Sequence, residues 1–405
     1  MAEKIPRSEM RRLPRAKPDG LVAAVLLSFL ATAGFFYVNI MPALVAGLVE
    51  GLHYSQREAG LVASANIYGA AFGALAAVFV IRHIRWRPAS VLLLLGLVGI
   101  ELISTMVHAA PWMIAVRFVD GSIGGLLIGI AFGVIARTGV PDRVFGMLLV
   151  VQFGLGGLGV MVLPRLVPIF GVPVLFLTLA FFSVVTLAMV PFLDDYPVEA
   201  TLKVVAGEPP RGIAWRPLSL ALLAVFLFQA GNMALAAYMI ELGKGYGLST
   251  DYVSAILGVA AWIGAIGSLL VVAMGTRFGR FFPLALALVL TVLGNAAFHF
   301  SASALIFGAA NVGTAVTWAF IIPYLLGMCA AFDTTGQAAA MGGFASHMGL
   351  ATGPFAAATL LGGANYPLLI DAAVATLIVS AVAALVPARI LDRCGTRPPP
   401  APARR

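Results

Sequence analysis

The chain is built from apolar runs that are each long enough to cross a lipid bilayer. A helical crossing needs about 20 mostly apolar residues, and twelve runs of this kind follow one another along the sequence. They cover residues 20–46, 59–81, 88–108, 112–136, 145–164, 171–192, 217–240, 252–274, 281–299, 303–327, 338–362 and 366–388. The sequence therefore predicts an all-α membrane protein with twelve transmembrane helices.

The composition excludes a soluble protein of this length. Apolar residues make up 61% of the chain and charged residues only 10%, whereas soluble domains carry about 25% charged residues. The two cysteines, Cys329 and Cys394, stand far apart and in no metal-ligand or CxxC spacing. We therefore expect no disulfide, no metal and no cofactor.

The distribution of basic residues predicts the orientation of the chain. With a cytoplasmic N-terminus, 21 of the 25 Lys and Arg residues fall on the cytoplasmic side, which is where membrane proteins carry their excess of positive charge. The basic N-terminus could also be a secretory signal, but its apolar run is long and eleven more follow. We expect a multi-pass protein of a bacterial-type inner membrane with both termini cytoplasmic. The net charge of +8 then suits an acidic membrane surface and requires no nucleic-acid partner.

The longest polar interruption divides the spans into two sets of six. It runs from Asp194 to Arg216 and shows no apolar periodicity, which is typical of a linker. The predicted organisation is a cytoplasmic tail (1–19), a first six-helix bundle (20–193), a cytoplasmic linker (194–216), a second six-helix bundle (217–388) and a cytoplasmic C-terminal tail (389–405).

Two similar segments indicate an internal duplication. Gly69–Pro88 aligns without gaps onto Gly264–Pro283 at a shift of 195 residues, and the alignment pairs glycines, arginines and prolines. Just upstream, Ser55 and Glu58 form a capping box, and Ser249 takes the position of Ser55 in the second half. Chance similarity between apolar runs is the alternative explanation. We expect the two halves to superpose as similar bundles.

Short motifs of this chain resemble those of the major facilitator superfamily. Gly275–Arg280 is similar to that family's loop motif between the second and third helices of a half, while Arg82–Arg87 keeps the basic residues but lacks the Asp and Gly. Arg117, followed by Gly121, resembles the fourth-helix motif. Gly349–Pro354 in the eleventh span is similar to a glycine-proline motif of antiporters.

The resemblance implies two pseudo-symmetric six-helix bundles that transport by alternating access. It implies a gating role for the loop-motif residues Arg82, Arg85, Gly275, Arg277, Gly279 and Arg280. In this family the first, fourth, seventh and tenth helices line the central cavity. The substrate-binding candidates are therefore the polar and aromatic residues of these helices, namely Tyr37, Asn39, Gln229, Asn232, Asn311 and Trp318. For each of them, a hydrogen bond between helices is the alternative role.

Charged residues inside the spans are candidate proton sites, because ionisable groups in a bilayer are costly and usually functional. The acids well inside spans are Glu101, Asp120 and Asp371, and the resemblance associates Arg117 with proton coupling. Glu101 and Arg117 lie equally far from the turn that joins their helices, so both are about 12 Å below the outer edge at 1.5 Å per residue. The sequence predicts an ion pair between them, for which Asp120 competes. A static structural pair is the alternative to a coupling role.

The fourth span carries a glycine every four residues. Gly121, Gly125, Gly129 and Gly133 remove side chains from one face of the helix, so a neighbouring helix can approach closely. Tight packing and sliding of the two helices are both compatible with this stripe.

Together these features predict a secondary transporter that moves a small organic solute by proton-coupled efflux. Proton-coupled uptake of a nutrient or metabolite is the alternative within transport, and a transporter-like receptor without transport activity is the alternative from another class. A metal importer would use residues such as His347 and Met348, which belong to no compact ligand set. The sequence contains no catalytic cluster that would suggest an enzyme. We expect a monomer whose partners are the solute, protons and membrane lipid.

The charge distribution leads to a first prediction, which concerns the C-terminus. An alkaline phosphatase fused after Arg405 should be inactive, because this enzyme needs the oxidising periplasm, and a green fluorescent protein at the same position should fluoresce. Phosphatase activity of the fusion in intact cells would contradict the predicted orientation and the number of spans.

Overall fold

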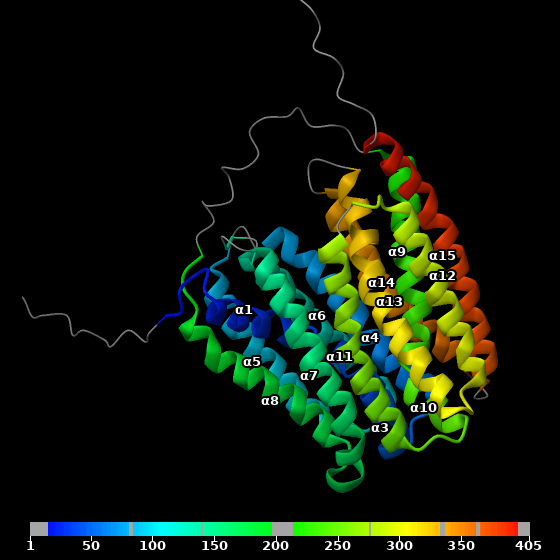
Figure 1. Ribbon diagram of the computed structural model, residues 1–405. Coiled ribbons are helices and arrows are strands. Elements are labelled where there is room, and N and C mark those ends of the chain that lie inside the picture. Colours follow the sequence, from blue (N-terminus) through cyan, green and yellow to red (C-terminus); the bar gives the residue numbers. More distant parts are fainter. Residues whose placement is uncertain are drawn as a thin grey trace, which may run out of the picture.

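The computed structural model describes residues 15–80, 84–135, 137–138, 141–196, 214–274, 277–332, 337–361 and 365–395. These residues form helices joined by short turns, and no strand occurs among them (Figure 1). The all-α prediction is therefore confirmed. Of the predicted gating residues, Arg82 and Gly275 lie outside the described part of the chain.

The first half contains eight α-helices and a short 3-10 helix. These elements are α1 (Leu21–Ala33), α2 (Phe36–Asn39), α3 (Met41–Gly51), α4 (Gln56–Val80), α5 (Trp86–Ser104), α6 (Ala110–Ile135), α7 (Pro141–Phe170), α8 (Pro173–Met189) and η1 (Val190–Phe192). The second half follows with α9 (Trp215–Ala236), α10 (Met239–Gly245), α11 (Thr250–Met274), α12 (Phe281–Ala296), η3 (Ala297–Phe300), α13 (Ala304–Ala331), α14 (Gln337–Leu360) and α15 (Tyr366–Gly395).

These helices make up the twelve-helix membrane fold. Ten of the described helices are long and apolar enough to cross a bilayer, namely α4 to α9, α11 to α13 and α15. The first predicted span, expected to be continuous over residues 20–46, is divided into α1, α2 and α3. Pro42 lacks a backbone N–H and stands in the first turn of α3, where an interrupted helix can tolerate it. The eleventh span corresponds to α14.

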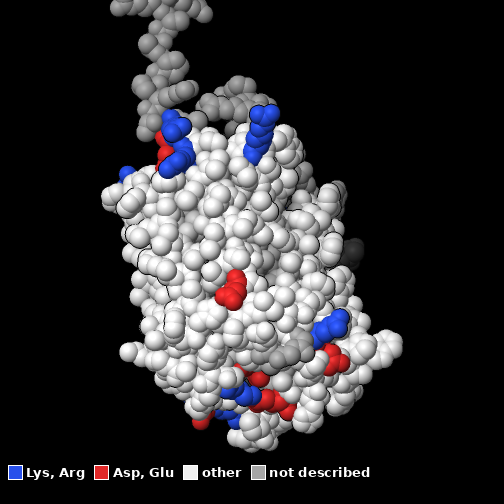
Figure 2. All heavy atoms as spheres, turned by 90° about the vertical axis from the view of Figure 1, so that its right-hand side faces the viewer, with Lys and Arg blue, Asp and Glu red and all other residues white. Residues whose placement is uncertain are grey.

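The polar residues are distributed as a membrane-spanning fold requires. Figure 2 shows one face of the molecule, with basic and acidic side chains gathered at its two ends and a wide uncharged belt between them, in which an acidic side chain stands isolated. The long helices expose large apolar side chains such as Val289 and Leu293 of α12 and Val382 of α15, which lipid tails would cover.

The two halves lie side by side and meet along two helix pairs. In Figure 1 most helices of the first half, coloured blue to green, lie to the left of those of the second half, which run from green α9 to red α15. Across their interface α4 packs against α14, and α7 packs against α11. The first helix of each half is interrupted, by Phe35 and Ile40 in the first half and by Tyr238 in the second. The two halves therefore share the same irregularity at equivalent places.

Helix starts repeat between the halves as the duplication predicts. The Ser55 backbone N–H donates to Oε2 of Glu58 at 2.9 Å, and the Glu58 N–H donates to Oγ of Ser55 at 3.2 Å, so the predicted capping box is confirmed. In the second half, Oγ of Ser249 accepts the Tyr252 N–H at 3.3 Å.

The loop before α12 is fixed by a carboxylate from the last helix. The backbone N–H groups of Arg280 and Phe281 donate to the carboxylate of Asp392 at 2.8 to 3.0 Å, which places a negative charge at the helix N-terminus. Gly279 adopts φ +69°, a left-handed conformation that favours glycine. Arg85 directly precedes α5, as Arg280 directly precedes α12.

The glycine stripe of α6 allows close contact with α4. A Cβ atom on Gly121 or Gly125 would collide with the backbone of α4 at Asn66 or Ala70, and one on Gly129 would collide with the side chain of Ala77. The backbones of the two helices therefore touch along this face, as small residues permit in membranes.

This contact leads to a second prediction, which concerns stability. Gly125→Ala should lower the free energy of unfolding by about 1–3 kcal/mol, because the added methyl group overpacks the contact with α4. Gly99→Ala is the matched control, since a Cβ there meets nothing within 4 Å and alanine favours a helix by up to about 1 kcal/mol. Thermal unfolding of the purified proteins in detergent measures both. Equal melting temperatures for the two variants would contradict the tight contact.

Candidate functional site

A cavity of about 710 Å³ lies between the two halves. Helices α1, α2, α6 and α7 of the first half and α9, α11, α12, α13 and α14 of the second half contribute to its wall. The cavity extends to Phe132, Phe145 and Leu326, which stand within two turns of the ends of α6, α7 and α13. These helix ends lie on the side of the molecule where the described chain begins at Arg15 and ends at Gly395, called the tail side below.

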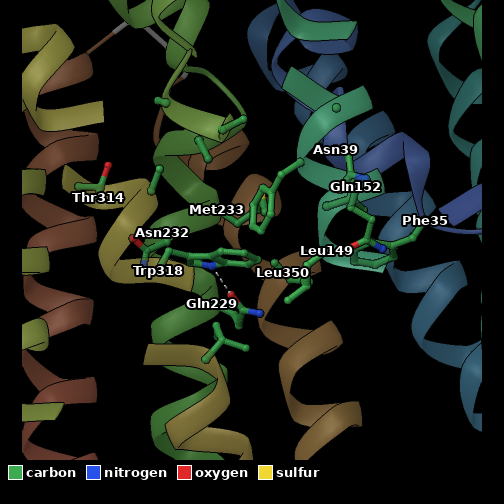
Figure 3. Close-up of a pocket in the computed structure, with 18 of the residues that line it drawn as sticks. Phe35, Asn39, Leu149, Gln152, Gln229, Asn232, Met233, Thr314, Trp318 and Leu350 are labelled. Atoms are coloured by element: carbon green, nitrogen blue, oxygen red, sulfur yellow. Dashed lines mark hydrogen bonds between the residues drawn. The ribbon is translucent and has the colours of Figure 1, made fainter. Parts of the chain in front are cut away.

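The first half contributes amides and aromatic rings to the wall. Figure 3 shows Phe35, Asn39 and Gln152 on one side of the cavity. Gly156 of α7 lies against Asn39, where a Cβ atom would press on the Asn39 side chain, so glycine at this position makes room for the amide. Nδ2 of Asn39 is enclosed and has no hydrogen-bond partner in the described part of the chain.

The second half contributes an ordered chain of hydrogen bonds. Nε1 of Trp318 donates to Oε1 of Gln229 at 2.8 Å (Figure 3). Nε2 of Gln229 in turn donates to Oγ of Ser346 at 2.9 Å. These bonds link α13, α9 and α14 and fix the plane of the indole ring. The ring of Phe153 from the first half meets that indole edge-on, with centroids 6.3 Å apart.

The cavity wall carries no formal charge. Among the described residues, no Asp, Glu, Lys or Arg lines it, and His347 is its titratable side chain. The imidazole meets the ring of Phe35 edge-on at 5.6 Å between centroids, which brings the two halves into contact. No group of three or more His, Cys, Asp or Glu that could hold a metal ion occurs in the described part of the chain.

A buried ion cluster lies within the first half. The Arg117 guanidinium is 0% exposed, and its NH1 donates to both carboxylate oxygens of Glu101, at 3.0 and 3.1 Å. The same nitrogen reaches Oδ2 of Asp120 at 3.4 Å, and NH2 donates to the hydroxyl of Ser104. Nδ2 of Asn66 donates to Oδ2 of Asp120 at 2.7 Å. The ion pair between Glu101 and Arg117, with Asp120 competing, is confirmed.

Aromatic rings enclose this cluster. The Arg117 guanidinium lies 5.1 Å from the ring centroid of Phe176 and 5.9 Å from that of Tyr37, distances at which a cation is attracted to an aromatic face. Tyr37 does not line the cavity, although it was a substrate-binding candidate. The break between α1 and α2 rotates its ring toward α6 instead.

The remaining candidates separate into two groups. The cavity is lined by Asn39, Gln229, Asn232, Asn311 and Trp318. Asp371 lies elsewhere: its side chain is 69% exposed on α15, and Oδ1 meets Nε2 of His299 at 2.9 Å. It does not join the cluster of Glu101, Arg117 and Asp120.

Sequence reasoning did not select five polar residues of the cavity wall, namely Gln152, Asn295, Thr314, Ser346 and His347. Thr314 lies in the tenth helix, and the other four belong to the fifth, ninth and eleventh helices, which were not expected to face the cavity. Gly156 and Gly157 in α7 are the signal that could have revealed it, because a glycine pair beside a polar residue indicates close approach of another element.

Comparisons with known proteins agree with this architecture. A model of the Major Facilitator Superfamily matches residues 24–367. Similar solved structures include a mutant of the nucleoside transporter NupG, with 12% identity, a TM-score of 0.67 and coverage of 93% of this chain and 99% of that one. The human organic anion transporter MFSD10 (TETRAN) is 17% identical, with a TM-score of 0.63 and coverage of 93% of this chain and 100% of that one. The proton:xylose symporter XylE is 15% identical, with a TM-score of 0.63 and coverage of 92% of this chain and 94% of that one. No curated protein sequence matches the chain.

The buried cluster leads to a third prediction. Arg117→Met should lower the free energy of unfolding by about 3–5 kcal/mol, because it leaves two buried carboxylates without their counter-charge. Arg165→Met is the control: Arg165 is 43% exposed and pairs with Asp251 at 2.8 Å, and an exposed pair contributes about 0–1 kcal/mol. Denaturation of both purified variants measures the difference. An Arg117 variant as stable as the Arg165 variant would contradict the cluster's structural role.

Proposed function

Because the chain belongs to the Major Facilitator Superfamily, we propose that it is a proton-coupled secondary transporter that exports a small organic solute across a bacterial-type inner membrane. The observation that carries this proposal is the cavity between the two halves, whose described lining contains no Asp, Glu, Lys or Arg, together with a buried charge cluster that is connected to it through α2. The basic tails and linker are proposed to be cytoplasmic, and the protein is proposed to act as a monomer.

Polar contacts join the halves on the side away from the tails. Nζ of Lys244 in α10 donates to Glu50 in α3, and Nε of Arg165 in α7 donates to Asp251 in α11 at 2.8 Å. These elements end or begin at the turns opposite the tail side. Both pairs connect the first half to the second and would have to separate for the cavity to open there.

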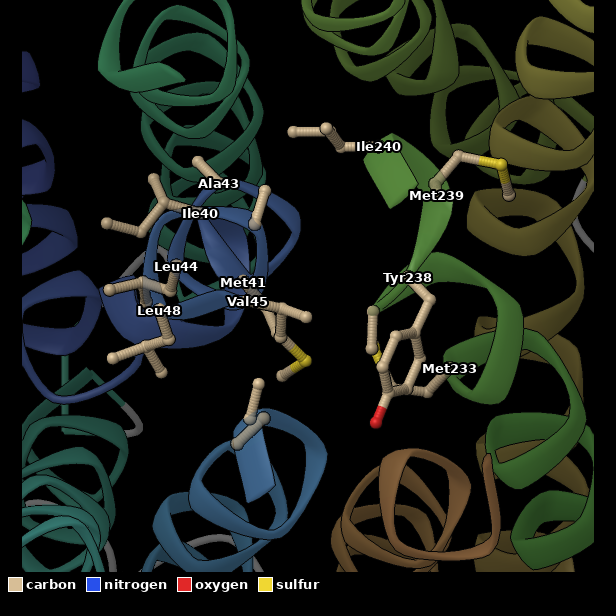
Figure 4. Close-up of a cluster of buried hydrophobic side chains, with 14 of the residues drawn as sticks. Ile40, Met41, Ala43, Leu44, Val45, Leu48, Met233, Tyr238, Met239 and Ile240 are labelled. Carbon is tan, nitrogen blue, oxygen red and sulfur yellow. The ribbon is translucent and has the colours of Figure 1, made fainter. Parts of the chain in front are cut away.

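Buried groups beneath these ion pairs also connect the halves. The Tyr238 hydroxyl donates to the backbone carbonyl of Gln56 at 2.7 Å, and Nε2 of Gln56 donates to the Tyr366 hydroxyl at 2.5 Å. Figure 4 shows Met41 and Val45 of α3 facing Tyr238 within one apolar cluster. This layer separates the cavity from the side opposite the tails, which supports a conformation with access from the tail side.

Alternating access would reverse this arrangement. The interrupted first helix of each half, at Ile40 and Tyr238, meets the other half inside this layer. Arg85, Arg277, Gly279 and Arg280 stand at the tail side, before α5 and α12. We propose that they contact the opposite half when the tail side closes, together with Arg82 and Gly275.

The charge balance of the buried cluster supports proton coupling. One guanidinium, from Arg117, faces two carboxylates, from Glu101 and Asp120. With both acids ionised the cluster carries a net negative charge, which is costly to hold away from water. A single proton on either acid neutralises the cluster. We assign the exchangeable proton to this pair of acids.

Efflux is favoured over uptake by the eleventh helix. Gly349 and Gly353, in the segment similar to an antiporter motif, lie against the backbone of α9 at Phe226 and Ala230. Glycine there permits the close contact through which an antiporter motif would act. Proton-coupled uptake is the second candidate, because XylE, which shares the fold, is a proton:xylose symporter.

The proposal leads to a fourth prediction. A solute is first identified by its stabilising effect on the purified protein in a thermal-shift screen, and its flux into proteoliposomes is then measured. Glu101→Gln should retain counterflow exchange but lose pH-driven flux, because the amide can still bond to Arg117 but cannot bind and release a proton.

The control is Asp371→Asn, which removes an exposed carboxyl outside the cluster and should change neither flux. Unchanged pH-driven flux in the Glu101 variant would exclude Glu101 as the proton site. If the solute moves in the same direction as the protons, the protein is a proton-coupled importer and the proposed efflux is wrong.

A further inference from the structure

The polar side chains of the second half share one hydrogen-bonding pattern at the cavity wall. Nδ2 of Asn232, Asn295 and Asn311 donates to the backbone carbonyl four residues earlier in the same helix, at 2.8 to 2.9 Å. Nδ1 of His347 does the same toward Gly343 at 2.8 Å. In each case one N–H group is satisfied by the protein itself, and each asparagine keeps its second N–H group. A carbonyl can only accept, so the donating atom of each side chain is fixed.

This pattern leaves acceptors free. Four acceptor atoms have no hydrogen-bond partner among the described residues: Oδ1 of Asn232, Asn295 and Asn311, and Nε2 of His347. None of these four atoms is completely buried. Nε1 of Trp318 is already bonded to Gln229. The second half therefore offers lone pairs to the cavity beside the second N–H group of each asparagine, and a bound solute that supplies O–H or N–H groups can bond to these lone pairs.

Organic anions do not fit this wall. A carboxylate or phosphate would meet the lone pairs of amide oxygens and imidazole nitrogen together with uncharged amide N–H groups, and no Lys or Arg occurs among the described residues that line the cavity. Arg117 of α6 is buried, and its guanidinium already pairs with Glu101 and Asp120. An anion in such a site would lose its hydration shell, and no cationic partner would compensate for that loss.

Organic cations lack a counter-charge as well. Neither Glu nor Asp lines the described part of the cavity, and a buried ammonium group without a carboxylate carries a large desolvation penalty. The rings of Trp318, Phe153 and Phe35 offer apolar surface to a ring-shaped frame. Gln152 has no hydrogen bond to the described residues and can donate or accept, which gives the first half an adaptable contact.

We infer that the transported solute is an uncharged molecule with a ring frame, which donates O–H or N–H hydrogen bonds to the side chains of Asn232, Asn311 and His347. This inference rests on the proposed function, since it names the solute class of the same cavity. It excludes organic anions and cations as preferred solutes.

The test uses matched probes that differ in charge on a common frame. Tryptophol, tryptamine and indole-3-acetate share an indole and are neutral, cationic and anionic at pH 7. Glucose, glucosamine and glucuronate form the corresponding pyranose set. Binding is measured by calorimetry and thermal shift on the purified full chain, and transport by flux into proteoliposomes. In at least one set the neutral probe should bind ten-fold or more tightly than both charged probes.

Isosteric variants test the reason for this preference. Asn232→Asp and Asn311→Asp place a carboxylate in the cavity wall, so each should shift the preference toward tryptamine or glucosamine by ten-fold or more. Asn365→Asp is the matched control, because Asn365 lies at the exposed start of α15, outside the cavity. It should leave the preference unchanged. Two variants are used so that poor folding of one leaves the other informative, and the wild-type probe series stands by itself.

The outcomes separate this inference from the proposed function. A charged probe that binds and is transported as well as its neutral counterpart overturns the inference but leaves the transporter intact. Binding without any flux overturns the proposed function and leaves the solute class in place. Absence of both binding and flux for all six probes overturns the inference, and flux of an unrelated solute found by screening would then still support a transporter.

Discussion

Inside a bilayer no water is available to satisfy a polar group, and the structure of this protein depends on that constraint. Most of its described backbone lies in helices, whose N–H and C=O groups pair within the helix. The Arg117 guanidinium, 0% exposed, is surrounded by Glu101, Asp120 and Ser104. Asparagine side chains at the cavity bond to their own helices. At the cavity these bonds leave Oδ1 of the asparagines and Nε2 of His347 for a solute, and the cavity's chemistry follows from these atoms.

The sequence predicted most of this fold because span length and charge distribution are local properties of a chain. The depth argument correctly paired Glu101 with Arg117, since both residues are equally far from one turn. The capping box at Ser55 was correct for the same reason, because it involves neighbouring residues only. Features that depend on local spacing could be read without any knowledge of tertiary structure.

The rest of the site depends on helix rotation, which the sequence leaves open. Tyr37 was expected in the cavity, but the interruption before α2 turns its ring to Arg117. His347 and Gln152 were visible as polar residues, yet their facing depends on how α14 and α7 pack across the interface. Asp371 is inside a span by sequence but lies on the outer surface of α15. A hydrophobic run that is apolar on all sides carries no signal for which face is buried.

The short helix α2 gives the two sites a physical connection. Tyr37 lies over the Arg117 guanidinium, and Asn39, two residues later, lines the cavity. The charge cluster and the cavity wall therefore share one four-residue element, Phe36–Asn39, with an interruption on each side. In the proposed transport cycle, a proton that enters the cluster would change the net charge beneath Tyr37. Any resulting shift of α2 would move Asn39 at the cavity wall, and a solute bound to Asn39 would act back on the cluster, because coupling between two sites is reciprocal.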